Sequence, residues 1–164
     1  MLRFLCSLSV LFLLLTSGQS AAATFSVSNT EGLRQALIDA AGNRQNDTII
    51  LAAGAYKTTD DGSGTFEFND NEPFDLVIKS EDGLNRGNVI IEGDNFKRVF
   101  KFTNPQHPQC SITLERISVI NNHSDGIDSD CNLNIVGSGI LSRSGAKGIS
   151  SRGGIASEGS IIID

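Results

Sequence analysis

The spacing of hydrophobic residues predicts one helix near the start of the chain. Residues three and four apart lie on the same face of a helix. The apolar residues that recur at this spacing are Leu33, Ala36, Leu37 and Ala40. Ser28-Asn29-Thr30-Glu31 has the Ser-x-x-Glu form of a capping box, and Gly42 supplies a C-terminal stop. We therefore expect an amphipathic helix of about three turns, from about Thr30 to Ala41.

Beyond this helix, short apolar runs alternate with clusters of Gly, Asn, Asp and Ser, which is typical of β-structure. Another β-prone run, Thr24 to Val27, precedes the helix. The later runs expected to be strands are Thr48 to Leu51, Leu76 to Ile78, Val89 to Ile91, Val99 to Phe102, Ile112 to Leu114, Ile117 to Ile120, Leu133 to Val136, Ile140 to Leu141 and Ile161 to Ile163. Asn-Gly turn signals are scarce between them, which disfavours antiparallel hairpins. We expect the polar segment from Thr58 to Pro73 to be a loop.

The last part of the chain repeats at a step of about 22 residues. Gly126-Ile127 recurs as Gly148-Ile149 (148 − 126 = 22). Apolar residues that follow the same step are Leu133 and Ile155, and Val119, Leu141 and Ile163. One coil of a β-solenoid with three short strands would give such a step, and chance matches in a Gly/Ser/Ile-rich tail are the alternative. The pattern predicts an all-β fold, a parallel β-helix, with the helix as a cap over its first strand edge.

Four N-terminal segments resemble the start of pectin lyase-like right-handed parallel β-helix proteins. These segments are Thr24-Phe25-Ser26-Val27, Gly32-Leu33-Arg34-Gln35-Ala36, Asn46-Asp47-Thr48-Ile49-Ile50-Leu51 and Gly54-Ala55-Tyr56. Further on, Gly153-Gly154-Ile155 and the strand Ser160 to Ile163 are more similar to repeat-bearing surface proteins, such as polymorphic outer-membrane proteins and adhesins. The resemblance implies a right-handed β-helix that binds polysaccharides or cell surfaces, without implying one reaction. Because the chain stops at Asp164 directly after an apolar strand, we expect the β-helix domain to be incomplete.

The first residues have the form of a cleavable signal peptide. Arg3 gives a positive start, the apolar run from Phe4 to Leu15 follows, and small residues at Ala21, Ala22 and Ala23 suit cleavage. The apolar run is about a dozen residues, short of the roughly 20 that span a bilayer. We expect residues 1–23 to be removed, leaving residues 24–164 as the β-helix domain. The protein should be secreted or held at the cell surface, with no transmembrane span after cleavage.

The charge of the chain bears on its possible partners, and its cysteines bear on a possible disulfide. The formal charge of the whole chain is −6, and loss of Arg3 makes it 12 − 19 = −7. Phosphate binding needs clustered Lys and Arg, so we expect no nucleic-acid partner. Cys110 and Cys131 are the cysteines left after cleavage, and they lie about one coil apart in an oxidising compartment. They can fall at neighbouring positions on stacked strands, so we predict a disulfide between them. Two free buried cysteines are the alternative.

The segment from His123 to Asp130 holds the candidate catalytic chemistry. It resembles the Asn-Thr-Asp-Gly-Ile-Asp motif of polygalacturonases, with Asp125 at the first aspartate and His-Ser in place of Asn-Thr. The aspartate pair that this family has one coil later is missing, because Lys147 stands there. Asp125, Asp128 and Lys147 are the catalytic candidates, since carboxylates or a basic residue could serve a hydrolase or a lyase.

The same segment supplies the candidate metal ligands. Asp125, Asp128 and Asp130 are the calcium candidates, because carboxylate oxygens are the ligands that Ca²⁺ prefers. We expect no required cofactor. Ordinary turn chemistry is the competing interpretation of this Asp- and Gly-rich stretch, with Asp125 and Asp128 as exposed turn residues.

The sequence therefore predicts an exported β-helix protein of the surface or extracellular space, with a polysaccharide or cell-surface ligand. A binding or adhesive module is the preferred interpretation. A polysaccharide lyase or glycoside hydrolase of the pectin lyase-like superfamily is the alternative.

Overall fold

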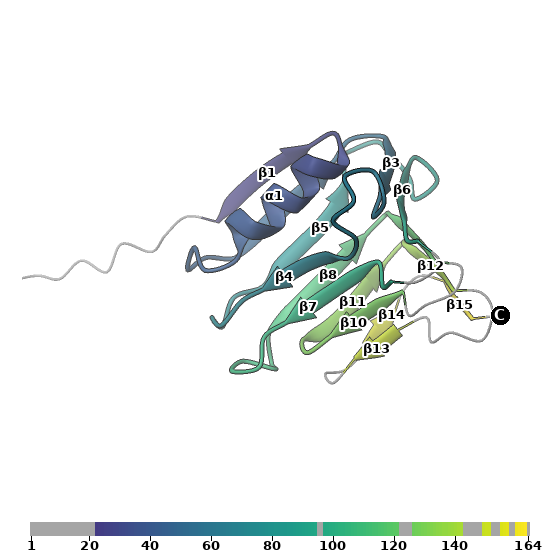
Figure 1. The fold of residues 1–164 in the computed structure, drawn as a ribbon. Helices are drawn as coiled ribbons and strands as arrows, with labels where there is room; N and C mark the ends of the chain where they lie inside the picture. Colours follow the sequence, from purple (N-terminus) through teal and green to yellow (C-terminus); the bar gives the residue numbers. More distant parts are fainter. Residues whose placement is uncertain are drawn as a thin grey trace, which may run out of the picture.

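The computed structural model describes residues 22–94, 97–121, 126–142, 149–151, 155–157 and 160–163. Within these ranges the chain forms a parallel β-helix with one α-helix at its N-terminal end (Figure 1). Successive strands pass from one sheet to the next and return to the first, and every strand pair is parallel. The all-β fold class predicted from the sequence is confirmed. The described ranges contain no helix with both the length and the apolar character needed to cross a membrane.

Three sheets make up the described part of the stack. The sheet that we call sheet A contains, in spatial order, β1 (Ala23–Val27), β2 (Asp47–Leu51), β5 (Leu76–Ser80), β8 (Ser111–Glu115), β11 (Asn132–Val136) and β14 (Ile155–Ser157). Sheet B contains β3 (Gly54–Lys57), β6 (Val89–Glu92), β9 (Ser118–Asn121), β12 (Gly139–Ser142) and β15 (Ser160–Ile163). Sheet C contains β4 (Phe66–Asn69), β7 (Phe100–Thr103), β10 (Ile127–Ser129) and β13 (Ile149–Ser151).

The core consists of side-chain columns that run from coil to coil. Side chains alternate between the two faces of a strand, so each strand sends every second residue inward. Inward residues that pair in register include Ile49, Ile78, Leu114 and Ile135 in sheet A; Tyr56, Ile91, Val119 and Ile140 in sheet B; and Phe66, Phe100 and Ile127 in sheet C. All of these are almost fully buried. Apolar burial of this kind is the main stabilising contribution to the stack.

Each predicted strand overlaps an observed strand, but several observed strands were not predicted. The segment from Thr58 to Pro73, expected to be a loop, contains β4. Phe66 and Phe68 give β4 a buried inner face, and its backbone pairs with β7. The strands β3, β10, β13 and β14 were also missed, because each contains only one or two apolar residues and gives no periodic signal.

The 22-residue step is correct in two sheets and wrong in the third. Ile127 pairs with Ile149, and Leu133 pairs with Ile155, both at this step. In sheet B, however, Val119 pairs with Ile140 and not with Leu141, so the step there is 140 − 119 = 21. A slip of one residue would turn the buried Val119 and Ile140 to opposite faces of the sheet. Burial of this pair therefore decides the register.

Helix α1 (Thr30–Ala40) covers the first edge of the stack, as expected for a cap. It packs against β1, β2, β3 and β4, and Figure 1 places it at the opposite end from β13. Its N-cap is Asn29, whose Oδ1 accepts a 2.8 Å hydrogen bond from the Gly32 backbone nitrogen, so the capping box that we expected to begin at Ser28 is off by one residue. Gly42 ends the helical segment at φ 76°, which favours glycine.

The predicted disulfide partners lie on consecutive coils. Cys110 directly precedes β8, Cys131 directly precedes β11, and the structure joins them by a disulfide with a Cα–Cα separation of 5.0 Å. The two strands that follow are in register, and the Asn132 backbone nitrogen donates to the Cys110 carbonyl oxygen at 2.9 Å. The cross-link therefore joins two coils at the corner that leads into sheet A.

Candidate functional site

The outer face of sheet C carries one column of polar side chains. In its four strands, Phe66, Phe100, Ile127 and Ile149 form an inward column, so the residues after them point outward. These outward residues are Glu67, Lys101, Asp128 and Ser150, and they are paired in register from coil to coil. Glu67 is exposed, and the other three are half-buried. We call this set the sheet C column.

Charges in the sheet C column alternate in sign. Lys101 lies between Glu67 and Asp128, one strand away from each, and neighbouring strands are about 4.8 Å apart. A second cation approaches from the turn before β7, where Arg98 Nη1 lies 3.4 Å from Asp128 Oδ2. The side chains of Arg98 and Asp128 are 42% and 32% exposed, so solvent still reaches this pair. The arrangement offers both hydrogen-bond donors and acceptors to a ligand lying on the sheet.

Of the candidates predicted from the sequence, Asp128 belongs to the sheet C column. The expectation that it would be an exposed turn residue is wrong, because Asp128 is half-buried in β10 and pairs with Lys101 and Ser150. Asp125 and Lys147, the other catalytic candidates, lie outside the described residues. Their roles remain predictions.

Calcium binding also remains a prediction. Asp130 follows β10 directly, and its backbone nitrogen donates to the Phe102 carbonyl oxygen at 2.9 Å. Ser129, between Asp128 and Asp130, is buried. The described ranges contain no group of three or more His, Cys, Asp or Glu side chains placed to hold a metal ion. The third calcium candidate, Asp125, is not among the described residues.

Sequence reasoning missed Glu67 and Lys101. A signal for both exists, since Phe66-Glu67-Phe68 recurs as Phe100-Lys101-Phe102. These two segments pair residue for residue as β4 and β7. Their separation of 100 − 66 = 34 residues differs from the later step of about 22, so a search for one fixed period does not find them.

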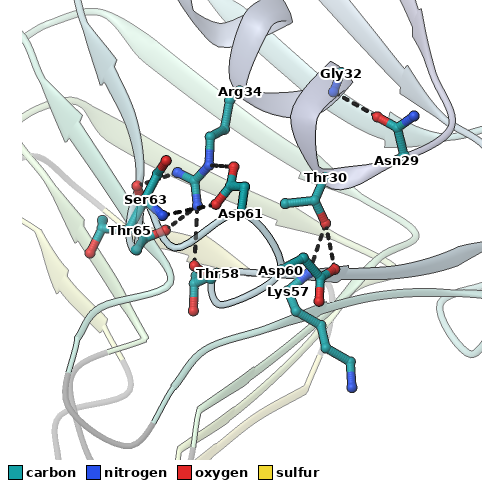
Figure 2. A network of polar contacts seen from close by, with 11 residues as sticks. Asn29, Thr30, Gly32, Arg34, Lys57, Thr58, Asp60, Asp61, Ser63 and Thr65 are labelled. Atoms are coloured by element: carbon teal, nitrogen blue, oxygen red, sulfur yellow. Dashed lines mark hydrogen bonds and ion pairs between the residues drawn. The ribbon is translucent and has the colours of Figure 1, made fainter.

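A second polar cluster joins α1 to the loop between β3 and β4 (Figure 2). The Arg34 guanidinium donates to the backbone oxygens of Thr58 (3.3 Å), Thr65 (2.8 Å) and Gly64, and it forms an ion pair with Asp61. The side chain of Arg34 is only 15% exposed, because these groups surround it. The cluster therefore satisfies its own charge and hydrogen bonds, and its role is to hold the loop on the cap.

The N-terminal end of α1 is also joined to this loop by hydrogen bonds. Thr30 Oγ1 donates to Asp60 Oδ2 at 2.9 Å and accepts from the Lys57 backbone nitrogen at 3.1 Å (Figure 2). Hydrogen bonds from Arg34 lower the pKa of the Asp61 carboxyl, with a smaller contribution from the Ser63 backbone nitrogen. Asp60 and Asp61 are thus engaged by protein groups, which argues against a cation site in this loop.

No family model, curated protein or solved structure matches this chain. The parallel β-helix fold therefore rests on the strand pairing itself.

Proposed function

We propose that this protein is an exported β-helix module that binds polysaccharide or another glycan of a cell surface along the sheet C column. The observation that carries the proposal is the in-register column of Glu67, Lys101, Asp128 and Ser150, which crosses four consecutive coils. Three interstrand steps of about 4.8 Å give it a length of about 14 Å. An open face of this length suits an extended, hydroxyl-rich chain better than a small molecule, which usually needs a concave pocket.

The chemistry of the column supports a ligand that carries carboxylates as well as hydroxyls. Lys101 offers three donors, while Glu67 and Asp128 accept hydrogen bonds from hydroxyl groups. The aromatic side chains of β4 and β7 are buried in the core, so they offer no stacking platform for sugar rings. Polar contacts must then provide the affinity. A uronate carboxylate beside Lys101, with sugar hydroxyls on the two flanking carboxylates, matches the alternating charges.

A glycoside hydrolase is the second candidate, favoured by one observation. Glu67 and Asp128 lie two strands apart on one face, a backbone spacing of about 9.6 Å. This is close to the roughly 6.5–9.5 Å between the carboxyl groups of inverting glycosidases. Such enzymes keep one carboxyl protonated by apolar surroundings. Glu67 is exposed and Asp128 is ion-paired with Arg98, so binding is the better-supported function.

We also propose kinship with the pectin lyase-like superfamily. The segments that resemble this family form β1, the body of α1, β2 and β3. Tyr56, at the end of the Gly54-Ala55-Tyr56 segment, is buried in the core beneath the cap. The support is that these four segments form consecutive elements at the start of the coil stack, and fold alone does not specify a reaction.

The test measures binding of polygalacturonate and alginate by the purified protein in affinity electrophoresis. Lys101→Gln should weaken binding at least fivefold, because it removes the cation at the centre of the column. Glu67→Gln should strengthen it, because it removes a carboxylate that repels a uronate. Lys79→Gln is the matched control, since Lys79 is a partly buried lysine on the outer face of sheet A.

Equal affinity of the parent and Lys101→Gln, or no binding to either polymer, would overturn the proposal. Release of shorter chains from these polymers by the parent, lost in Asp128→Asn, would replace it with the hydrolase or lyase. Measurement with and without calcium in the same assay tests whether Asp128 and Asp130 serve as calcium ligands.

A further inference from the structure

A hollow on the outer face of sheet B combines aliphatic walls with one cation. Its volume is about 200 Å³. The residues that line it are Arg86, Ser118, Val119, Ile120, Gly139, Ile140 and Leu141. Val119 and Ile140 point into the core, so the outward walls come from Ile120 and Leu141, which are paired in register on β9 and β12. This surface is on a different sheet from the sheet C column.

Arg86 is presented by a tight turn between β5 and β6. The Asn85 side chain accepts a 2.9 Å hydrogen bond from the Gly87 backbone nitrogen, and the Asn88 side chain accepts one of 3.0 Å from the Asn85 backbone nitrogen. Ser118 on β9 fastens the turn to the sheet, because its Oγ donates to the Arg86 carbonyl oxygen at 2.8 Å. The backbone of Arg86 is thus fixed at one end of the hollow.

The guanidinium end of Arg86 lies against Gly139. A Cβ atom at Gly139 would lie 3.6 Å from both Cδ and Nη1 of Arg86, so the arginine side chain lies directly over this glycine. Among the residues that the structure describes, none forms a hydrogen bond or ion pair with the Arg86 guanidinium. An exposed arginine fork is well suited to grip a planar carboxylate by two hydrogen bonds.

We propose that this hollow binds a small carboxylate with a short apolar tail. The carboxylate lies on Arg86 beside Gly139, and the tail lies along Ile120 and Leu141. These two side chains are two residues further along their strands than Ser118 and Gly139, about 7 Å from the guanidinium end. Pockets for drug-sized ligands have volumes of roughly 300–1,000 Å³. A hollow of about 200 Å³ therefore fits a tail of only a few carbon atoms.

The test is a titration of the isotopically labelled protein with hexanoate, followed by backbone amide NMR. Saturable shifts are expected for the amides of Gly139 and Leu141, with hexanamide and hexylamine at least tenfold weaker because they lack the carboxylate. Arg86→Gln should weaken hexanoate binding at least tenfold. Arg44→Gln is the matched control, since Arg44 is also a surface arginine, with 81% side-chain exposure, and it lies between α1 and β2, outside the lining of the hollow.

A second variant separates loss of the site from loss of the fold. Gly139→Val places a side chain on the floor of the hollow, where the nearest atoms are at ordinary contact distance, and valine favours an outward strand position. It should abolish binding while the remaining amide spectrum stays native. Equal shifts with hexanoate and hexanamide, no shifts with hexanoate, or undiminished binding by Arg86→Gln or Gly139→Val would overturn the proposal.

Discussion

The guanidinium of Arg34 lies over the ring of Phe66, 4.5 Å from the ring centroid. Arg34 comes from the capping helix, and Phe66 is the first residue of the first strand of sheet C. Phe66 continues the contact into the core, because its ring centroid is 5.7 Å from that of Phe100 on the next coil. One side chain thus connects the cap, the loop between β3 and β4, and the aromatic column beneath the proposed ligand face.

Replacement of this arginine should loosen the cap. Arg34→Ala removes hydrogen bonds to the carbonyl oxygens of Thr58, Gly64 and Thr65 and the cation–π contact with Phe66. We expect a loss of about 2–3 kcal/mol in the free energy of unfolding, measured by urea denaturation. Arg34→Lys should recover only part of this loss, because an ammonium cannot reproduce the planar fork.

The control for the Arg34 prediction is Arg44→Ala. Arg44 pairs with Glu72 at 3.2 Å, but its side chain is 81% exposed, so the expected loss is about 0.5 kcal/mol or less. Equal destabilisation by Arg34→Ala and Arg44→Ala would contradict the assigned role of the Arg34 cluster.

The disulfide between Cys110 and Cys131 should contribute measurably to stability. Closure of a loop of this length restricts the unfolded chain and is worth about 3 kcal/mol in the chain-entropy model. We expect the double variant Cys110→Ser, Cys131→Ser to lose about that much in urea unfolding. Intact mass after alkylation without reductant should find neither cysteine labelled. Labelling of both thiols in the folded protein would disprove the bridge.

Tyr56 should resist ionisation until the fold opens. Burial raises the pKa of its hydroxyl above the ordinary value of 10.0, and the hydroxyl lies 2.9 Å from the Ala52 carbonyl oxygen and 3.0 Å from that of Val27. Because the folded pKa is the higher one, stability is intact below pH 10.0 and is lost as the pH rises through the folded value.

The chain contains a single tyrosine, so tyrosinate absorbance reports Tyr56 alone. We expect the absorbance change to begin above pH 10.0 and to coincide with loss of the β-type circular dichroism signal. Ionisation at the ordinary value with a native dichroism spectrum would show that the hydroxyl is accessible to water.

Acid should reduce the stability that the ionised Asp61 carboxylate contributes to the attachment of the helical cap. Hydrogen bonds from Arg34 lower the pKa of Asp61 below its ordinary value of 3.8, so the ionised form favours the folded state. The stability from this group is therefore present above pH 3.8 and is lost as the pH falls through the lower folded value. Asp61→Asn should be less stable than the parent at neutral pH, and the difference should shrink on acidification. A difference that stays constant with pH would contradict this linkage.

Local features of the fold follow from the sequence alone. The apolar spacing from Leu33 to Ala40 predicts α1 almost to the residue, because a helix is built from contacts three and four residues apart. Apolar β-prone runs such as Thr48 to Leu51 also predict strands, because this signal is local too. The spacing of Cys110 and Cys131 predicts the disulfide between neighbouring coils. Their separation of 21 residues is close to the length of one coil in the last part of the chain.

Tertiary structure decided the sheet C column and the exact register. Glu67 and Lys101 meet because β4 and β7 pair across a connection whose length no local pattern sets. Val119 pairs with Ile140 and not with Leu141, because the side chains of Val119 and Ile140 are both buried and must point to the same face of the sheet. Asp128 lies in a strand and not in the expected turn, because its neighbour Ile127 is buried in register with Phe100. Pairing between coils is non-local, so only the assembled stack determines which polar residues share a face.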